Sequence, residues 1–414
     1  MKKNCNDEFD PNAHSVEQAL DKILKTINPI SDPETVGLHH VLGRILYKDI
    51  SSTINVPAFT NSAMDGYAIR FSDISSEKSK LEIAGVAYAG NPYTKKVQPG
   101  HCIRIMTGAC IPEGTDTVVM QEHVIKKDNT ISISAALKKG QNIRQLGEDL
   151  AIGEIALPKG RRVTAADVGL IASLGISAVS TVRKLNVAFF STGDELSDVE
   201  SELEAGQIYD SNRYALYAML QNLPVNIIDL GILKDDPNII KSTLSKLDPS
   251  IDFIITSGGV SVGDADYIKD ILDELGNVNF WKISMKPGRP LAFGTLKKKP
   301  FFGLPGNPVS AAVTFTQFVR PAILQILGNT FDPVSLLKVK CVSALKKRPG
   351  RTDYQRGILF SDENGDKAVK STGNQGSHVL SSMSQANCFI VLPLESGNVE
   401  AGDWVFVQPF SDIM

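Results

Sequence analysis

The stretch NVAFFSTGDEL, residues 186–196, joins a run of apolar residues directly to a polar loop that contains glycine. Three further segments repeat this order, namely VNIIDLGIL (225–233), DFIITSGGVSVGD (252–264) and FFGLPGNP (301–308). Apolar residues at helical spacing follow most of them, as in 213–220 and 267–275. Strands that alternate with helices and are apolar along their length predict a parallel sheet covered on both faces. We therefore expect a doubly wound α/β domain over about 184–330.

The flanking segments follow a different pattern. Ser15 is expected to cap a helix, with Gln18 at capping-box spacing, and Thr164 is expected to cap a second helix that ends at Gly175. Between about 53 and 150, short β-rich runs such as DTVVMQEHVIKK are separated by Gly, Pro and Asn. The C-terminal part returns to β character. A chain of 414 residues is too long for one hydrophobic core, so several domains are expected.

Composition excludes several classes of protein. With 42% apolar and 21% charged residues, the chain is typical of soluble globular proteins. The net charge of -3 excludes a global cationic footprint for nucleic acid. No apolar run reaches the roughly 18 residues of a membrane span, and the first ten residues have no apolar signal core. Five scattered cysteines without a CxxC motif argue against a disulfide framework or zinc site and favour the cytoplasm.

Polar loops follow the expected strands, and ligands of open α/β sheets bind beyond the carboxyl ends of strands. These loops are 191–195, 256–266, 304–310 and the pair Asp235-Asp236. The loop at 257–263 can present several backbone N–H groups at a helix start, which suits an anion. A tight turn capped by Asp264 or Asp266 is the structural alternative. The pair Asp194-Glu195 has a similar alternative, as two acidic residues in the first turn of a helix.

Charged residues in these loops indicate the chemistry. Lys282, Lys286 and Arg289 place three cations within eight residues, enough to hold an oxyanion such as phosphate. Two prolines and a glycine restrict the backbone there, which a merely solvated charge cluster does not require. Carboxylates in special loops, without accompanying His or Cys, suit a hard cation such as Mg²⁺. A P-loop lysine, a Rossmann GxGxxG and a Ser/His/Asp arrangement are all missing from the sequence. Together the loops predict a site for a metal-bridged phosphate compound.

Seven motifs occur in order along the chain and resemble one family. They are PAFTNSAMDGYAI (57–69), RIMTGA (104–109), GEDL (147–150), STGDEL (191–196), TSGGVSVGDADY (256–267), MKPGRPLAFG (285–294) and GLPGNPVSAAVTF (303–315). With GRTDYQRG (350–357) and TGNQGSHVLSSMSQAN (372–387), they resemble the MoeA-type molybdopterin molybdenumtransferases, which include the E domain of gephyrin. The resemblance implies an enzyme that inserts molybdenum from molybdate into adenylated molybdopterin. It also implies Mg²⁺ and the release of AMP, giving molybdenum cofactor.

The resemblance, carried over residue by residue, assigns the site. The expected catalytic residues are Asp65, Asp149, Glu195, Asp235, Asp266, Lys282 and Lys286. The expected substrate-binding residues are Thr107, Ser257, Gly258, Gly259, Ser261, Arg289, Pro305, Gly306, Asn307 and Pro308. The expected molybdate ligands are Lys286, Ser310, Arg356 and Ser377, and the hypothetical Mg²⁺ ligands are Glu195, Asp264 and Asp266. Two departures from the family pattern are Gln145, where many relatives have a second basic residue, and Cys110, where Pro is common.

The resemblance also implies a multi-domain subunit of α/β and β parts. We divide it into a tail (1–13), an α/β molybdopterin-binding domain (14–33 plus 184–330), a linking domain (34–52 plus 154–183), a β-rich lid domain (53–153) and a C-terminal β-barrel-like domain (331–414). The family is a homodimer whose cleft lies between the β-rich domain of one subunit and the α/β domain of the other. Further candidate partners are the molybdopterin adenylyltransferase and the molybdoenzymes that accept the cofactor.

Two alternatives remain open at this point. Molybdopterin adenylyltransferases resemble residues 184–330, but they are small and lack the segment that begins at Pro57. A non-catalytic scaffold, a role the gephyrin E domain also has, does not need a complete set of acidic and lysine residues. This chain has that set.

Overall fold

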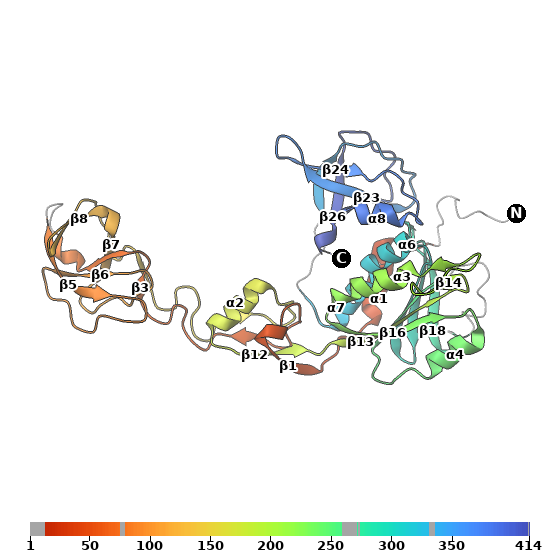
Figure 1. Ribbon diagram of the computed structural model, residues 1–414, viewed down its shortest axis with the longest axis horizontal. Coiled ribbons are helices and arrows are strands. Elements are labelled where there is room, and N and C mark those ends of the chain that lie inside the picture. The colour runs from red at the N-terminus through yellow and green to blue at the C-terminus, as the bar shows by residue number, and fades with distance from the viewer. Residues whose placement is uncertain (1–12, 75–78, 259–270, 272–273, 331–335, 413) are drawn as a thin grey trace.

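The computed structural model describes residues 13–74, 79–258, 271, 274–330, 336–412 and 414 (Figure 1). A β-rich domain lies at one end of the molecule, and a small linking part that contains α2 joins it to an α/β domain. A C-terminal β domain lies above the α/β domain in the same view. None of the helices in the described residues is long and apolar enough to cross a membrane.

The α/β domain is built on a six-stranded sheet of order β16-β13-β17-β21-β20-β18. The strands are β13 (Leu185–Thr192), β16 (Val225–Leu233), β17 (Phe253–Ser257), β18 (Gly276–Lys282), β20 (Pro290–Leu296) and β21 (Lys299–Leu304). The first four in the order are parallel, and β20 and β18 are antiparallel additions. The prediction of a wholly parallel sheet was therefore wrong at this edge. The short connections among the last three strands cannot hold a crossover helix, so those strands pair antiparallel.

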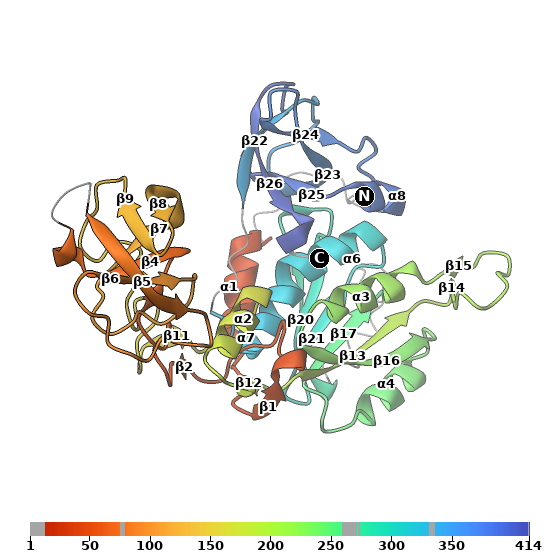
Figure 2. The same ribbon diagram turned by 60° about the vertical axis from the view of Figure 1, so that its left-hand side comes forward.

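Helices cover both faces of this sheet, which confirms the doubly wound fold (Figure 2). Along β13, Val187 and Phe189 pack into one core, and Ala188 and Phe190 pack into the other. The first core includes α1 (Val16–Thr26), α3 (Ser211–Gln221), α6 (Pro308–Thr314) and α7 (Arg320–Ile326), and the second includes α4 (Pro237–Ser245). The chain passes outward from β13 to β16 and then back across to β17. Right-handed crossovers in opposite directions place α3 and α4 on opposite faces.

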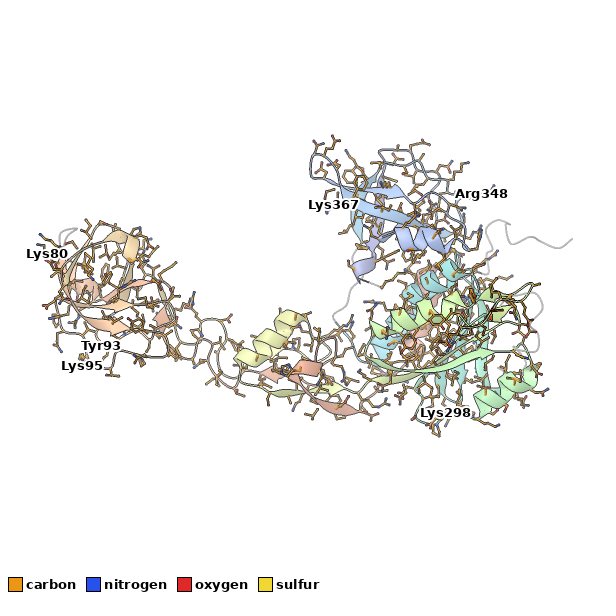
Figure 3. All side chains as sticks on the ribbon, in the orientation of Figure 1. Lys80, Tyr93, Lys95, Lys298, Arg348 and Lys367 are labelled. Carbon is orange, nitrogen blue, oxygen red and sulfur yellow. The ribbon has the colours of Figure 1, made fainter. Side chains whose placement is uncertain are left out.

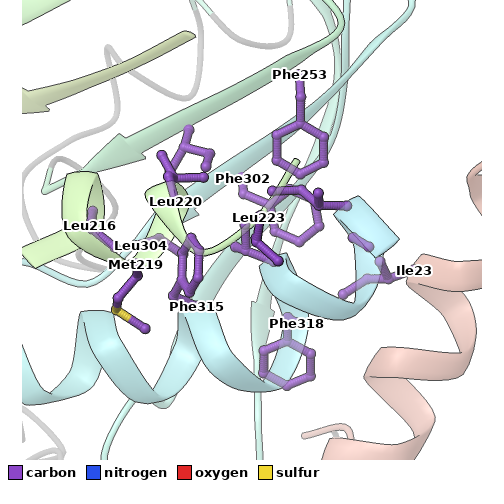
Figure 4. Packing of buried hydrophobic residues seen from close by; sticks show 14 of the residues in the cluster. Ile23, Leu216, Met219, Leu220, Leu223, Phe253, Phe302, Leu304, Phe315 and Phe318 are labelled. Atoms are coloured by element: carbon purple, nitrogen blue, oxygen red, sulfur yellow. The ribbon is translucent and has the colours of Figure 1, made fainter. Parts of the chain in front are cut away.

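Aromatic side chains fill the larger core, shown in Figure 4. The rings of Phe253 and Phe302 stack at a centroid distance of 5.1 Å. Phe315 and Phe318 belong to η4 (Phe315–Val319), a π-helical turn that joins α6 to α7. Ile23 of α1 packs into this core, so the N-terminal helix is part of the α/β domain although about 160 residues separate it from β13.

The two predicted helix caps are confirmed. Ser15 and Gln18 form both bonds of a capping box at the start of α1. Thr164 and Asp167 form the same arrangement at the start of α2 (Ala165–Ser173), and Gly175 follows with a φ of 72°. The predicted helix at 213–220 is α3. Most of the helix predicted at 267–275 lies outside the described residues.

The linking part holds two passages of the chain side by side. Strand β1 (Pro33–Gly37) pairs antiparallel with β12 (Ala178–Val182), and β2 (Ile50–Ser51) pairs with β11 (Ile155–Leu157). The 3-10 turn η1 (Leu38–His40) and helix α2 complete it, around a core of its own. The outgoing and returning chains are thus held together before the β-rich domain begins.

The β-rich domain is a six-stranded sheet of order β7-β4-β6-β5-β9-β8. Its strands are β4 (Gly66–Ile69), β5 (Lys80–Ala87), β6 (His101–Ile105), β7 (Thr117–Met120), β8 (Val124–Lys127) and β9 (Thr130–Ile133). The sheet's two edges, β7 and β8, are joined by η3 (Gln121–His123) alone. Three residues span at most about 10 Å, so the sheet curls until its edges approach. The single β run expected at 116–127 is therefore two strands. The short pair β3 (Asn61–Ser62) and β10 (Ile143–Arg144) and the turn η2 (Phe71–Asp73) complete the domain.

The C-terminal domain is a closed five-stranded barrel, which confirms the expected β-barrel-like domain. Its strands are β22 (Leu337–Cys341), β23 (Thr352–Ser361), β24 (Lys367–Ser371), β25 (Cys388–Leu392) and β26 (Trp404–Pro409). Strand β23 pairs with both β24 and β25, which closes the ring. The short strand β19 (Met285–Lys286) pairs with β23 and ties the α/β domain to the barrel. Helix α8 (Leu380–Gln385), the turn η5 (Phe410–Asp412) and the pair β14 (Leu196–Ser197) and β15 (Ile208–Tyr209) are the remaining elements.

Candidate functional site

Three parallel strands end together at one edge of the α/β sheet. Strand β17 lies between β13 and β21, and Ser257 is in register with Ser191 on one side and Leu304 on the other. Buried Asn212, at the start of α3, donates from Nδ2 to Ser257 Oγ at 2.9 Å and to the Gly306 carbonyl at 2.7 Å. One amide thus joins the end of β17 to the loop after β21. Asn212 was not in the predicted set, because only the tertiary arrangement brings α3 to this edge.

Glycines allow the loops at this edge to approach closely. Gly258 has a φ of +90°, and its N–H donates to the Leu304 carbonyl at 3.1 Å. A Cβ at this position would lie 2.4 Å from the Thr192 carbonyl oxygen. No side chain fits there without displacing backbone. The structure therefore brings together Ser257, Gly258, Pro305 and Gly306 of the predicted substrate-binding set. Gly259 and Ser261 lie outside the described residues.

Carboxylates gather beside this edge. Asp194 and Glu195 are exposed at the end of β13, and the backbone N–H of half-buried Asp235 donates to Asp194 Oδ1 at 3.2 Å. Burial, and then repulsion by Asp194 and Glu195, raises the pKa of Asp235. Its buried Oδ1 accepts no hydrogen bond from the described residues. A bound cation would relieve both the repulsion and the unpaired oxygen, so this donor set fits Mg²⁺.

The described residues alone do not complete a metal site. Among them, no three His, Cys, Asp or Glu side chains are grouped so that they could hold a metal ion. Asp264 and Asp266, two of the expected Mg²⁺ ligands, lie outside the described residues. Asp194 was not in the predicted set although the STGDEL motif contains it, because a motif does not tell which of two adjacent carboxylates faces Asp235.

The lysine loop lies between the α/β domain and the barrel. Lys282 ends β18, and exposed Lys286 belongs to β19, which pairs with the barrel strand β23. Gly288 has a φ of +97°, and a Cβ there would lie 2.6 Å from Thr314 Oγ1 and 3.4 Å from the Ser310 carbonyl. The loop is therefore packed against α6. Arg289 follows and is half-buried. The Ile283 N–H donates to the Arg289 carbonyl at 2.7 Å, and this bond closes the loop.

The expected molybdate residues meet at this junction. Helix α6 begins after Asn307, with Pro308 in its first turn, and the Val309 N–H donates to the Ser377 carbonyl at 3.1 Å. Ser310 is buried. The Arg356 guanidinium, also buried, donates to the Gly376 carbonyl at 2.9 Å, the Asn374 carbonyl at 3.2 Å and Ser382 Oγ at 3.0 Å. These bonds hold the loop that carries Ser377, and burial lowers the pKa of Arg356 to about 10.

The remaining predicted residues lie in the β-rich domain. Asp65 Oδ1 accepts bonds from the Thr107 backbone N–H at 2.7 Å and from Thr107 Oγ1 at 2.8 Å, and these bonds lower the pKa of Asp65. Asp149 is exposed near the same domain's base, where its N–H donates to the Val56 carbonyl. Figure 1 shows this domain at the opposite end of the molecule from the α/β sheet. Within one subunit, the structure does not bring Asp65, Thr107 and Asp149 to the strand-end site.

The two departures from the family pattern occupy turns of the β-rich domain. The Gln145 N–H donates to Glu148 Oε2 at 2.7 Å, and Cys110 forms an isolated bridge with Asn61. Both residues take part in local turn geometry.

The structure combines a β-rich domain with a curled sheet, a doubly wound sheet with glycine-lined strand ends, and a β-barrel. Together these parts define a multi-domain protein of the molybdopterin-binding class. Family models match in three successive regions, the MoeA N-terminal region at 14–175, a probable molybdopterin binding domain at 188–325 and the MoeA C-terminal region at 338–410. The chain belongs to the MoeA family of molybdopterin molybdenumtransferases, enzymes of molybdenum cofactor biosynthesis.

Individual relatives cover nearly the whole chain. A molybdopterin molybdenumtransferase of Haemophilus influenzae is 45% identical over 97% of this chain and 99% of its own length. A protein of the same name from Nostoc is 35% identical over 96% of this chain and 93% of its own. The crystal structure of a molybdopterin biosynthesis MoeA protein from Pyrococcus horikoshii matches with a TM-score of 0.82 and 30% identity, over 96% of this chain and 100% of that one.

Proposed function

We propose that this chain inserts molybdenum from molybdate into adenylated molybdopterin, with Mg²⁺-dependent release of AMP, and so produces molybdenum cofactor. The observation that carries the proposal is that three strand ends meet between a cluster of acidic side chains and the lysine loop. An anionic substrate needs a cation on one side and basic side chains on the other, and this edge offers both. Full-length similarity to proteins named for this activity supports it.

Each group has a distinct task in this proposal. Ser257, Gly258 and the loop from Pro305 to Pro308 would bind the phosphate part of the substrate, because their backbone is open to close approach. Glu195, Asp264 and Asp266 would hold Mg²⁺, which when bound offsets negative charge on phosphate oxygens. Lys282, Lys286 and Arg289 would stabilise charge that develops there during cleavage.

Molybdate would bind where the lysine loop, α6 and the barrel meet. Lys286 supplies the charge, and Ser310 and Ser377 supply hydroxyl groups at the same junction. The described bonds of Arg356 support a role in holding the Ser377 loop in place. Sulfur ligands for molybdenum belong to the pterin, so the protein needs no cysteine cluster there.

A homodimer is part of the proposal. Asp65, Thr107 and Asp149 can complete the site of a partner subunit because they lie far from the site of their own chain. An exposed apolar surface beside the strand-end site supports an interface. It includes Ile208, Tyr209, Tyr214 and Tyr217, each with 39–55% of its surface exposed.

The test is AMP release from adenylated molybdopterin, measured with and without Mg²⁺ and with and without molybdate. We expect AMP release to depend on both Mg²⁺ and molybdate. In Lys286→Gln, the rate of release should fall at least tenfold, which corresponds to the loss of one charge-assisted hydrogen bond. Lys298→Gln removes the same charge from an exposed turn and is expected to leave release unchanged. Folded protein that releases no AMP under any condition would contradict the proposal. Consumption of ATP with unadenylated molybdopterin would indicate the adenylyltransferase reaction instead.

The cellular setting follows from the same proposal. A cytoplasmic location fits the free thiols of Cys102, Cys110, Cys341 and Cys388. The molybdopterin adenylyltransferase, which would supply the substrate, and the molybdoenzymes that accept the cofactor are the proposed partners.

A further inference from the structure

A second basic pocket lies on the barrel side of Lys286. It has a volume of about 390 Å³ and is formed by β19 together with the barrel loop at 346–351. Its lining includes five cationic side chains and a single carboxylate, which are Lys286, Lys346, Lys347, Arg348, Arg351 and Asp353. Of these residues, only Lys286 belongs to the site described above. Such an excess of positive charge in one concave surface favours an anionic ligand.

Hydrogen bonds from a buried lysine hold the loop that forms this pocket. Lys347 is 4% exposed, and its Nζ donates to the carbonyls of Arg348 and Ser396, each at 3.0 Å. The Gly350 N–H adds a bond to the Leu394 carbonyl at 2.8 Å. Burying an ammonium group is costly unless it is hydrogen-bonded, and these bonds supply that compensation. Lys347 therefore fixes the loop and is not available to a ligand.

The other charged side chains on the loop are not held by hydrogen bonds or ion pairs within the described part of the chain. The carbonyls of Lys346 and Arg348 accept bonds from Gln355 and Lys347, but no hydrogen bond or ion pair joins the side chains of Lys346, Arg348 and Arg351 to another described residue. The single carboxylate, Asp353, is buried and lies 4.0 Å from Lys286 Nζ, so it balances the lysine. Three cations thus remain close together around the pocket, at a repulsive cost that a bound dianion would remove.

We propose that this pocket is a second oxyanion site, which takes a tetrahedral dianion next to Lys286. Arg348 and Arg351 suit such a ligand because a guanidinium group can donate two parallel bonds to oxyanion oxygens. Molybdate and a phosphate monoester, such as the phosphate end of the pterin compound, share this chemistry. The inference rests on the proposed function in one respect, namely that Lys286 faces molybdate on its other side.

Titration calorimetry on the full-length protein at low ionic strength tests this site, with sodium molybdate in one arm and phenyl phosphate in the other. In Arg348→Gln/Arg351→Gln, we expect affinity for the preferred dianion to fall at least about tenfold, as for the loss of charge-assisted hydrogen bonds. Lys367→Gln is the matched control, because Lys367 lies on the opposite side of the barrel from Arg348 (Figure 3) and bonds only to Ser361 among the described residues.

The outcomes separate this inference from the proposed function. In Ser377→Ala, which alters the first molybdate site, the binding that depends on Arg348 and Arg351 is expected to persist. Weaker binding of molybdate or of phenyl phosphate in the double variant supports the site and identifies its ligand. Unchanged binding of both dianions in the double variant overturns it. Failure of AMP release would contradict the proposed function and leave the calorimetric result standing.

Discussion

Single residues determine how closely the strand ends can approach one another. Gly258 occupies a left-handed conformation with the Thr192 carbonyl against the place where a side chain would begin. The TSGG motif predicted a glycine-rich loop, and the structure adds the reason for one of its glycines. The contact between Asp235 and Asp194 shows what sequence motifs do not predict. Sequence put several carboxylates in the region, but burial and the bond to Asp194 arise only after β13 and β16 pair.

Gly258→Ala is expected to lower both stability and AMP release. The left-handed φ costs an alanine about 1–2 kcal/mol, and displacement of the Thr192 backbone adds to this cost. Gly231→Ala is the matched control, because Gly231 has a φ of +78° but nothing within 4 Å of its Cβ position. Urea unfolding and AMP release measure the two effects. Equal losses in the two variants would show that the close contact at Gly258 has no consequence.

At the scale of elements, local signals were predicted well and non-local pairings were not. The capping boxes of α1 and α2 involve residues three positions apart, so the sequence contains all the information needed. The run at 116–127 looked like one strand. Its two halves pair with β4 and β9, and the distant partners determine where the run breaks. Similarly, the antiparallel β18 and β20 follow from connection length, which the apolar pattern does not report.

Arg183 connects elements at the boundary between the linking part and the α/β sheet. Its guanidinium donates to Asp252 Oδ2 at 2.6 Å and Oδ1 at 2.9 Å, and to Asp32 Oδ2 at 3.1 Å. Burial alone would raise the pKa of Asp252, but hydrogen bonds from Arg183 and the Asn186 N–H outweigh burial and lower that pKa. The hydrogen bonds of Arg183 therefore hold the outgoing chain, the returning chain and the start of β17 together.

Asp252→Asn is expected to lower the unfolding temperature at pH 7 by about 5 °C, from a loss near 2 kcal/mol. The lowered pKa means that the carboxylate's stabilisation is present above its usual pKa and is lost as pH falls through the folded value. The difference between the proteins should therefore shrink below about pH 4. Calorimetric scans from pH 3 to 7 measure it. Asp21→Asn, in an exposed pair with Lys25, is the control and should change little. A difference as large at pH 3 as at pH 7 would contradict the explanation.

At the scale of the whole molecule, the expected site residues are divided between two opposite ends of the structure. The MoeA-type motifs predicted which residues belong to one site, yet nothing in their order shows that Asp65 and Glu195 lie in distant domains. That separation comes from the paired strands of the linking part, which hold the β-rich domain away from the α/β sheet. In the homodimer proposed above, one site would therefore be assembled from two subunits.

Mixed dimers test this division directly. Asp65→Asn and Glu195→Gln proteins are each expected to lose AMP release. After they are unfolded and refolded together, about a quarter of the wild-type release should return, because half of the dimers are mixed and each mixed dimer has one intact site. Co-refolding Asp65→Asn with Asp149→Asn serves as the control, since both changes lie in the same domain and no intact site forms. No recovery in the first mixture, with dimers present, would place each site within one subunit.

The side-by-side passage of the chain at β1 and β12 has a consequence for how this architecture diversifies. The β-rich domain enters and leaves the rest of the molecule through neighbouring strands, and the Val56 N–H closes its base with a 2.8 Å bond to the Leu150 carbonyl. A module attached in this way can be exchanged for another of different shape without altering the register of the central sheet. The roles proposed here for the β-rich domain in substrate recognition and for the strand ends in phosphate chemistry can thus be inherited as separate, transplantable parts.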